Sequence, residues 1–128
     1  MIKNSIVWIR DDFRLQDNPA LSFATNNHEF VSAIYIYDKK AFDNIREAQK
    51  WWISKSLKSL NEDLLKNNVN LEIIEDNQIN FFKKFKSNDI AVYWNKIYEP
   101  QELVKDKEII SELEKNKISY KFFKGNVL

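Results

Sequence analysis

The chain has 128 residues, of which 44% are hydrophobic and 30% charged, and its formal net charge is +1. This length and apolar content fit one compact domain with one core. The nearly balanced charge argues against a disordered chain and against a strongly basic nucleic-acid-binding protein. Because the chain has no cysteine, disulfides and thiolate metal sites are excluded.

The sequence contains one glycine and two prolines. Glycine-rich phosphate loops are therefore excluded, since they need several glycines where the backbone approaches phosphate. Near the N-terminus, the apolar stretch from Ile6 to Ile9 is far too short for a signal peptide or a membrane span. We expect a cytoplasmic protein without a membrane partner.

The first elements follow from local patterns. Residues 5–10 (SIVWIR) predict a strand, because successive apolar residues are typical of a parallel strand covered on both faces. Asn18 can cap free backbone N–H groups and Pro19 fits the first helical position, so a short helix is expected over 20–26. The second strand is expected over 30–37 (FVSAIYIY).

A loop should follow, and then a long helix from about Arg46 to Asn67. Its apolar residues repeat at spacings of four, three and four, which places them on one buried stripe: Ile53, Leu57, Leu60 and Leu64. Charged residues on the opposite side should point to water: Lys55, Lys58, Glu62 and Lys66. We expect this lysine-rich face to be solvated surface and not a DNA track.

The rest of the chain continues the alternation. Strands are expected over 71–75, 90–94 and 119–123, with helices over 79–86 and 101–116; in the last helix the inward residues should be Leu103, Ile110 and Leu113. Five strands alternating with four helices predict a single α/β domain over residues 1–128. Its expected architecture is a doubly wound five-stranded parallel sheet with helices on both faces.

Polar and aromatic residues follow three expected strands at their carboxyl ends, where ligands bind in such sheets. They are 10–14 (RDDFR), Asp38, and 95–100 (NKIYEP). From the residues alone, these are either solvated loop charges with an Arg–carboxylate network that holds the loops, or a ligand site. We expect the first and fourth strands to end side by side, with Arg10 and Asn95 bordering one crevice.

No catalytic residue and no metal ligand is predicted. His28 is the only histidine and lies in an expected Asn-rich turn. A metal site or a histidine-based nucleophilic triad would lack a second partner.

Four segments resemble, in the same order, motifs of the DNA photolyase and cryptochrome family. They are 7–21 (VWIRDDFRLQDNPAL), similar to the opening signature; 50–60 (KWWISKSLKSL), similar to the long helix; 91–100 (AVYWNKIYEP), similar to the fourth-strand motif; and 122–128 (FFKGNVL), similar to the start of the interdomain linker. The resemblance implies the Rossmann-like N-terminal domain of this family.

The function implied by the resemblance is light harvesting, by the antenna chromophore-binding domain of a deoxyribodipyrimidine photolyase. Such a lyase repairs DNA with light, but this domain is non-catalytic by itself. FAD would be bound by a helical C-terminal domain that is absent from residues 1–128, and DNA would be contacted only through that domain. Two alternatives stay open: the same domain of a cryptochrome-type blue-light photoreceptor, and a free-standing nucleotide-binding α/β module.

Two kinds of antenna site are implied by the resemblance. A methenyltetrahydrofolate pigment would contact Gln101 and Glu102, although Glu102 is also favoured in the first turn of a helix by the helix dipole. A deazaflavin or flavin pigment would lie against the first strand end and the long helix; the implied residues are Trp8, Arg10, Asp38, Lys50 and Trp52, with Asn95 at the shared crevice.

Three features modify this interpretation. Lys50 stands where many relatives have arginine, so the bidentate fork is lost and the charge kept. Asp11 adds an acid beside the pocket mouth, which disfavours an anionic pigment. Trp51 and Trp52 are about 100° apart on a helix, so one of them is expected to face the pigment pocket or the absent domain.

Overall fold

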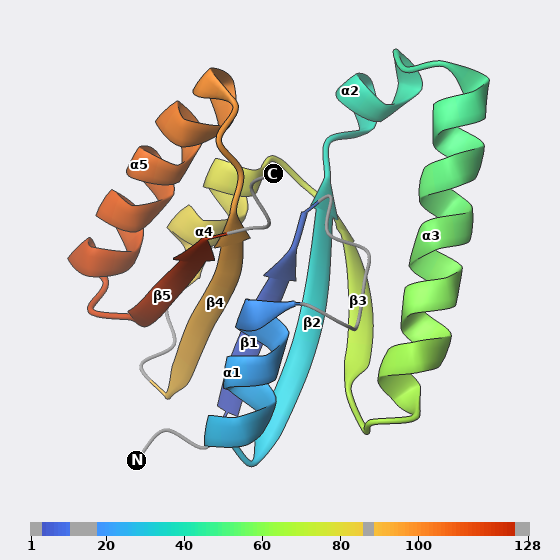
Figure 1. Cartoon of the computed structure of the whole chain (residues 1–128). Helices are drawn as coiled ribbons and strands as arrows, with labels where there is room; N and C mark the ends of the chain where they lie inside the picture. The colour runs from blue at the N-terminus through green and yellow to red at the C-terminus, as the bar shows by residue number, and fades with distance from the viewer. Residues whose placement is uncertain (1–3, 11–17, 86–88, 125–128) are drawn as a thin grey trace.

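The computed structural model describes residues 4–10, 18–85 and 89–124. These residues form a layered α/β unit with helices on both sides of one sheet (Figure 1). The elements in chain order are β1 (Asn4–Ile9), α1 (Pro19–Asn27), β2 (Phe30–Tyr37), α2 (Lys39–Asp43), α3 (Glu47–Leu65), β3 (Asn70–Glu75), α4 (Gln78–Lys84), β4 (Ile90–Lys96), α5 (Pro100–Lys115) and β5 (Ser119–Lys124).

The sheet is parallel throughout, with strand order β3-β2-β1-β4-β5. β1 lies in the middle, where Trp8 is opposite Ile34 of β2 and Trp94 of β4. The chain therefore passes from β1 to β2 and β3 on one side, and then returns past β1 to β4 and β5. This confirms the predicted doubly wound sheet, with its topological switch point between β1 and β4.

Alternate residues of each strand supply two separate cores. One lies under α1 and α3 and includes Val7, Ile9, Leu21, Leu60, Leu64 and Tyr93. The other lies under α4 and α5 and includes Trp8, Phe82, Trp94, Ile109 and Leu113. Successive strand residues point to opposite faces, so the apolar runs of β1 and β4 fill both cores at once.

The stripe predicted for α3 is largely confirmed. Leu57, Leu60 and Leu64 are buried, whereas Ile53 near the start of the helix is half-buried. The four charged residues expected on the other side, at 55, 58, 62 and 66, are exposed. The N-terminal half of α3 therefore packs less closely on the sheet than its C-terminal half.

Two expectations about the helices need correction. The predicted loop after β2 contains the short helix α2, because the Asp38 carboxylate accepts a hydrogen bond from the Lys40 backbone N–H at 3.0 Å and caps its start. In α5 the buried residues are Asp106, Ile109 and Leu113, whereas Leu103 and Ile110 are only half-buried. The buried stripe is rotated because Asp106 faces Arg10 at the end of β1. None of the described helices has the length and apolarity needed to cross a membrane.

Neighbouring leucines at the end of α3 allow a matched test of the core. Leu64 is fully buried, whereas Leu65 is 52% exposed. We expect Leu64→Ala to lower the free energy of unfolding by about 2–5 kcal/mol, because it removes buried apolar surface and leaves a cavity. Leu65→Ala should change it by less than about 0.5 kcal/mol. Urea denaturation of both variants measures the difference, and equal losses would contradict the burial of this face of α3.

Candidate functional site

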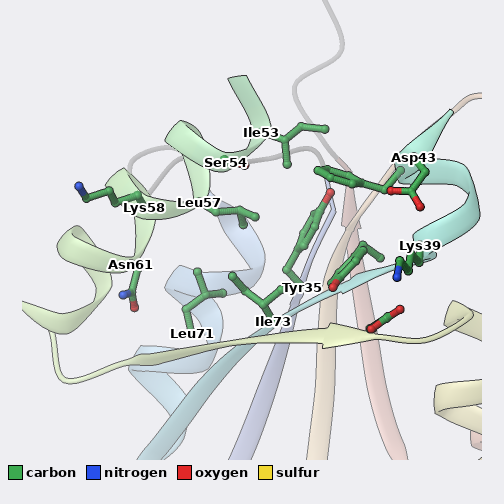
Figure 2. Close-up of a pocket in the computed structure, with 13 residues that line it drawn as sticks. Tyr35, Lys39, Asp43, Ile53, Ser54, Leu57, Lys58, Asn61, Leu71 and Ile73 are labelled. Carbon is green, nitrogen blue, oxygen red and sulfur yellow. The ribbon is translucent and has the colours of Figure 1, made fainter. Parts of the chain in front are cut away.

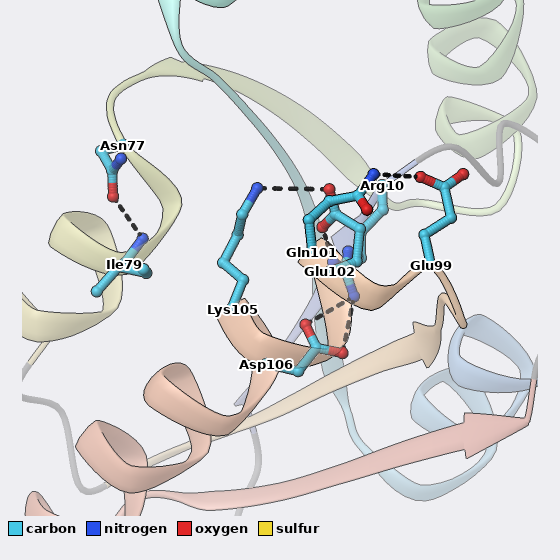
Figure 3. Close-up of polar contacts among 8 residues, drawn as sticks. All are labelled: Arg10, Asn77, Ile79, Glu99, Gln101, Glu102, Lys105 and Asp106. Carbon is cyan, nitrogen blue, oxygen red and sulfur yellow. Dashed lines mark hydrogen bonds and ion pairs between the residues drawn. The ribbon is translucent and has the colours of Figure 1, made fainter.

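Arg10, directly after β1, is held inside the fold by α5. Its guanidinium forms ion pairs with Glu102 and with Asp106, the latter at 2.9 Å between Nη1 and Oδ1 (Figure 3). The guanidinium also lies over the Trp8 ring, 4.4 Å from its centroid. Since Arg10 is buried, these contacts fix the first turns of α5 against the carboxyl end of β1.

The acids of this cluster outnumber the arginine. Lys105 adds a second cation at the rim, with its Nζ 3.4 Å from Oε1 of Glu102. Burial raises the pKa of Asp106 above its ordinary value, and the nearby guanidinium of Arg10 only partly opposes the rise. The Arg–carboxylate network considered in the sequence analysis is thus present, and it is largely internal.

Asn95, near the end of β4, forms hydrogen bonds with the start of α1. Its Oδ1 accepts a hydrogen bond from the Ala20 backbone N–H at 3.0 Å, and its Nδ2 donates to Asn18 Oδ1 at 2.7 Å. Asn18 Oδ1 also accepts from the Leu21 N–H and caps α1, as predicted. Asn95 therefore ties the start of α1 to the end of β4.

The expectation of one crevice lined by Arg10 and Asn95 is wrong for the side chains. The ends of β1 and β4 do lie side by side. However, Arg10 faces α5 and Asn95 faces α1, on opposite sides of the sheet. The strand ends are adjacent, but the pleat separates the two polar groups.

The tryptophans fall into two groups. Trp8 and Trp94 have no exposed surface and pack edge to face in one core, with ring centroids 5.7 Å apart. Trp51 and Trp52 are both largely exposed on α3, and Lys55 lies over the Trp51 ring. Trp8 therefore offers no surface to a pigment in this structure, whereas Trp52 is accessible.

A cavity of about 530 Å³ lies between α2, α3 and the strands β2 and β3 (Figure 2). We call it the α3 groove. Three aromatic residues, Tyr35, Tyr37 and Phe42, form part of its wall, and four aliphatic residues, Ile53, Leu57, Leu71 and Ile73, add to its apolar lining. The groove exists because the N-terminal half of α3 does not close on the edge strand β3, which leaves Ile73 56% exposed.

A smaller cavity of about 290 Å³ adjoins the α3 groove at the carboxyl end of β2. Tyr35, Tyr37, Phe42 and Ile53 line both cavities. The smaller cavity extends to Asp38 on one side and to Lys105 on the other. Together the two hollows connect the strand-end edge of the sheet with the space under α3.

The structure brings some of the predicted pigment residues to these hollows. Asp38 lines the smaller cavity and also caps α2. Lys50 lies beside the groove, with its Nζ 5.9 Å from the Phe42 ring centroid and 3.2 Å from Glu47 Oε1. Trp8 and Arg10, which were predicted to contact a deazaflavin or flavin pigment, are buried on the other face of the sheet.

The predicted folate residues lie in the first turn of α5. Gln101 is exposed and donates a hydrogen bond from Nε2 to Glu99 at 2.8 Å. Glu102 is half-buried and joined to Arg10 and Lys105. Asp11 and the rest of 11–17, part of the opening motif, lie outside the described residues.

Sequence reasoning missed the aromatic wall of the α3 groove. Tyr35 and Tyr37 alternate in β2 and so share one face, and Asp38 is a recognisable helix cap before Lys39–Asp43. These two signals together could have placed Phe42 beside both tyrosines; Tyr37 and Phe42 pack edge to face at 5.8 Å.

The described residues contain no cluster of acids and histidine suited to a metal ion. His28 lies at the end of α1, with its Nε2 2.6 Å from the Tyr93 hydroxyl. Burial raises the pKa of Tyr93, which favours the protonated phenol in this contact.

Asp106 generates a pH prediction. Because its pKa is higher in the folded than in the unfolded chain, protonation of Asp106 stabilises the fold; that contribution is complete below about pH 4 and is lost as the pH rises through the folded-state pKa. Asp106→Asn cannot titrate. The free energy of unfolding of the wild type, minus that of the variant, should therefore fall as the pH rises from about 4.

Urea unfolding across this pH range measures the difference. Glu108→Gln, an exposed change on the same helix, is the control and should show no comparable trend. A wild-type minus Asp106→Asn difference that grows with pH would mean that Arg10, and not burial, dominates the titration of Asp106.

Comparisons with known proteins agree with this architecture. The DNA photolyase family model matches residues 5–128. The chain is 32% identical to a deoxyribodipyrimidine photo-lyase of Agrobacterium fabrum over 96% of its length, and 30% identical to Cryptochrome-2 of Arabidopsis thaliana over 100%. It spans only 26% and 22% of those two proteins, about a quarter of their length.

A solved structure shares the fold closely. An archaeal photolyase from Sulfolobus tokodaii, crystallised with two FAD molecules, superposes with a TM-score of 0.85 at 26% identity, covering 94% of this chain and 29% of that one. The matched fold is that of the photolyase N-terminal domain. The family model covers residues 5–128, and the strand order and the helices on both faces agree with it. This chain therefore belongs to the DNA photolyase family.

Proposed function

We propose that this chain is a light-harvesting unit that holds an antenna pigment in the α3 groove and the adjoining cavity. The observation that carries the proposal is the aromatic wall formed by Tyr35, Tyr37 and Phe42 beside a hollow of about 530 Å³. A volume of roughly 300–1,000 Å³ with a mainly apolar lining is typical of sites for small cofactors. An aromatic wall suits a planar heteroaromatic ring.

The side chains that line the groove suit the binding of a pigment better than they suit bond chemistry. Among the described residues, those lining the two cavities include no histidine. Such a site binds and orients a pigment without reacting with it. The Sulfolobus photolyase with two FAD molecules supports a second flavin-like ligand in a related fold.

A folate pigment is the second candidate, and it would use a different place. Gln101 and Glu102 are neighbours at the start of α5, and Gln101 is exposed. Their amide and carboxylate groups can hydrogen-bond the polar edge of a pterin. In this proposal the pigment would lie at the end of α5, and the α3 groove would not be required.

We assign FAD binding and light-driven repair to a helical partner domain outside these 128 residues. DNA would be contacted through that domain, because this chain has a net charge of only +1. A cryptochrome-type photoreceptor would use the same pigment-binding unit for signalling. The 30% identity to Cryptochrome-2 of Arabidopsis thaliana supports this role as an alternative to light harvesting for DNA repair.

Two substitutions distinguish the pigment sites. Phe42→Ala should weaken binding of riboflavin or a deazaflavin about tenfold, because one face of the aromatic wall is lost, and should leave binding of methenyltetrahydrofolate unchanged. Gln101→Ala should do the reverse. Quenching of pigment fluorescence during titration with protein measures both affinities. Each variant is the control for the other, and no binding of any pigment by the wild type would overturn the proposed function.

The assignment of repair to a separate helical domain gives a further prediction. The chain mixed with FAD and illuminated should not repair thymine dimers in DNA, because this proposal places the repair chemistry in the helical domain. Chromatography of the digested DNA measures the remaining dimers, with a complete photolyase as the positive control. Repair above the level of FAD alone would contradict the assignment.

A further inference from the structure

Three basic side chains near the two cavities are paired with acids. Lys50, beside Phe42, has its Nζ 3.2 Å from Glu47 Oε1. Lys105, at the edge of the smaller cavity, is 3.4 Å from Glu102 Oε1. Arg10 is buried between Glu102 and Asp106. Each of these three cations thus already has an acidic partner.

The lining of the α3 groove carries no excess of positive charge. Its charged residues are two cations, Lys39 and Lys58, and two acids, Asp43 and Glu75. The side chain of Lys58 points away from the other labelled residues, whereas Lys39 and Asp43 lie together at the opposite end (Figure 2). Glu75 belongs to that end, because it pairs in register with Tyr37 at the end of β2.

One ammonium therefore meets two carboxylates where the groove reaches the carboxyl ends of the strands. The adjoining cavity has a similar distribution of charge. Asp38 lines it, and Lys105, the one cation among its described lining residues, is joined to Glu102. A phosphate group placed at this end would meet more acids than cations among the described residues, which is unfavourable.

We propose that Asp38, Asp43 and Glu75 are specificity-determining residues that exclude phosphorylated pigments from this site. The ligand class that fits is a planar heteroaromatic ring with an uncharged side chain, bound by aromatic contacts and without a phosphate or diphosphate anchor. The inference rests on the proposed function, since it specifies the ligand of the same groove.

Riboflavin, FMN and FAD test the inference directly, because they share one ring and differ in phosphate. Fluorescence titration at low salt should give dissociation constants for FMN and FAD that exceed that of riboflavin. The double variant Asp43→Asn/Glu75→Gln should bind FMN roughly three- to tenfold more tightly, the size expected for two like-charge contacts in a solvated site, with riboflavin binding unchanged. The gain should shrink at about 0.5 M salt through screening.

The control is Glu62→Gln/Glu72→Gln. It makes the same change in net charge at two exposed residues that do not line either cavity, and it should alter FMN binding by less than about twofold. Wild-type binding of FMN or FAD that is as tight as that of riboflavin, or tighter, would overturn the specificity while leaving the pigment site intact. Failure of all three flavins to bind would overturn both the flavin-type site and the specificity.

Discussion

The parallel pairing of β1 with β4 is the interaction on which the rest of the molecule depends. It brings Trp8 opposite Trp94 and places the ends of two strands, distant in sequence, beside each other. Because successive residues of a strand point to opposite faces, the first polar groups past the apolar runs separate: Arg10 holds α5, and Asn95 holds α1. The switch point is thus occupied by contacts that fasten one helix to each face. These contacts build the scaffold, whereas the space of the α3 groove lies beside β2 and β3.

That space follows from incomplete coverage of an edge strand. α3 buries Leu57, Leu60 and Leu64, but its first turns, around Ile53, stand off from β3. α2 closes part of the gap and contributes Phe42. The hollow therefore keeps an apolar and aromatic lining without being filled by the protein's own side chains. Its lining carries two lysines and two acids, so the groove lacks the excess of positive charge that is typical of a phosphate-binding site.

Much of the fold could be predicted because its signals are local. Apolar runs identified all five strands within two residues at each end, and the spacing of leucines identified the buried face of α3. The site was less predictable for two physical reasons. A rule about strand ends specifies an edge of the sheet but not the face on which each side chain lies, so Arg10 and Asn95 were assigned to one crevice. The short helix α2 depends on the cap by Asp38, and it was treated as loop although the cap was visible in the sequence.

The contrast between Arg10 and Lys50 shows how a charged residue should be weighed in such a fold. Arg10 lies at the end of a central strand, beneath α5, where removing a guanidinium from water is favourable only with acids around it; Glu102 and Asp106 supply them. Lys50 lies near the start of α3, at the loosely packed side of the sheet, and has one acidic partner among the described residues, Glu47. A cation buried in the sheet thus needs acidic partners from the fold, because burial of an unpaired charge is costly, whereas a cation at an edge can interact with a ligand. Candidate ligand residues in this fold are therefore better sought where α3 leaves the edge strand open than at the centre of the switch point.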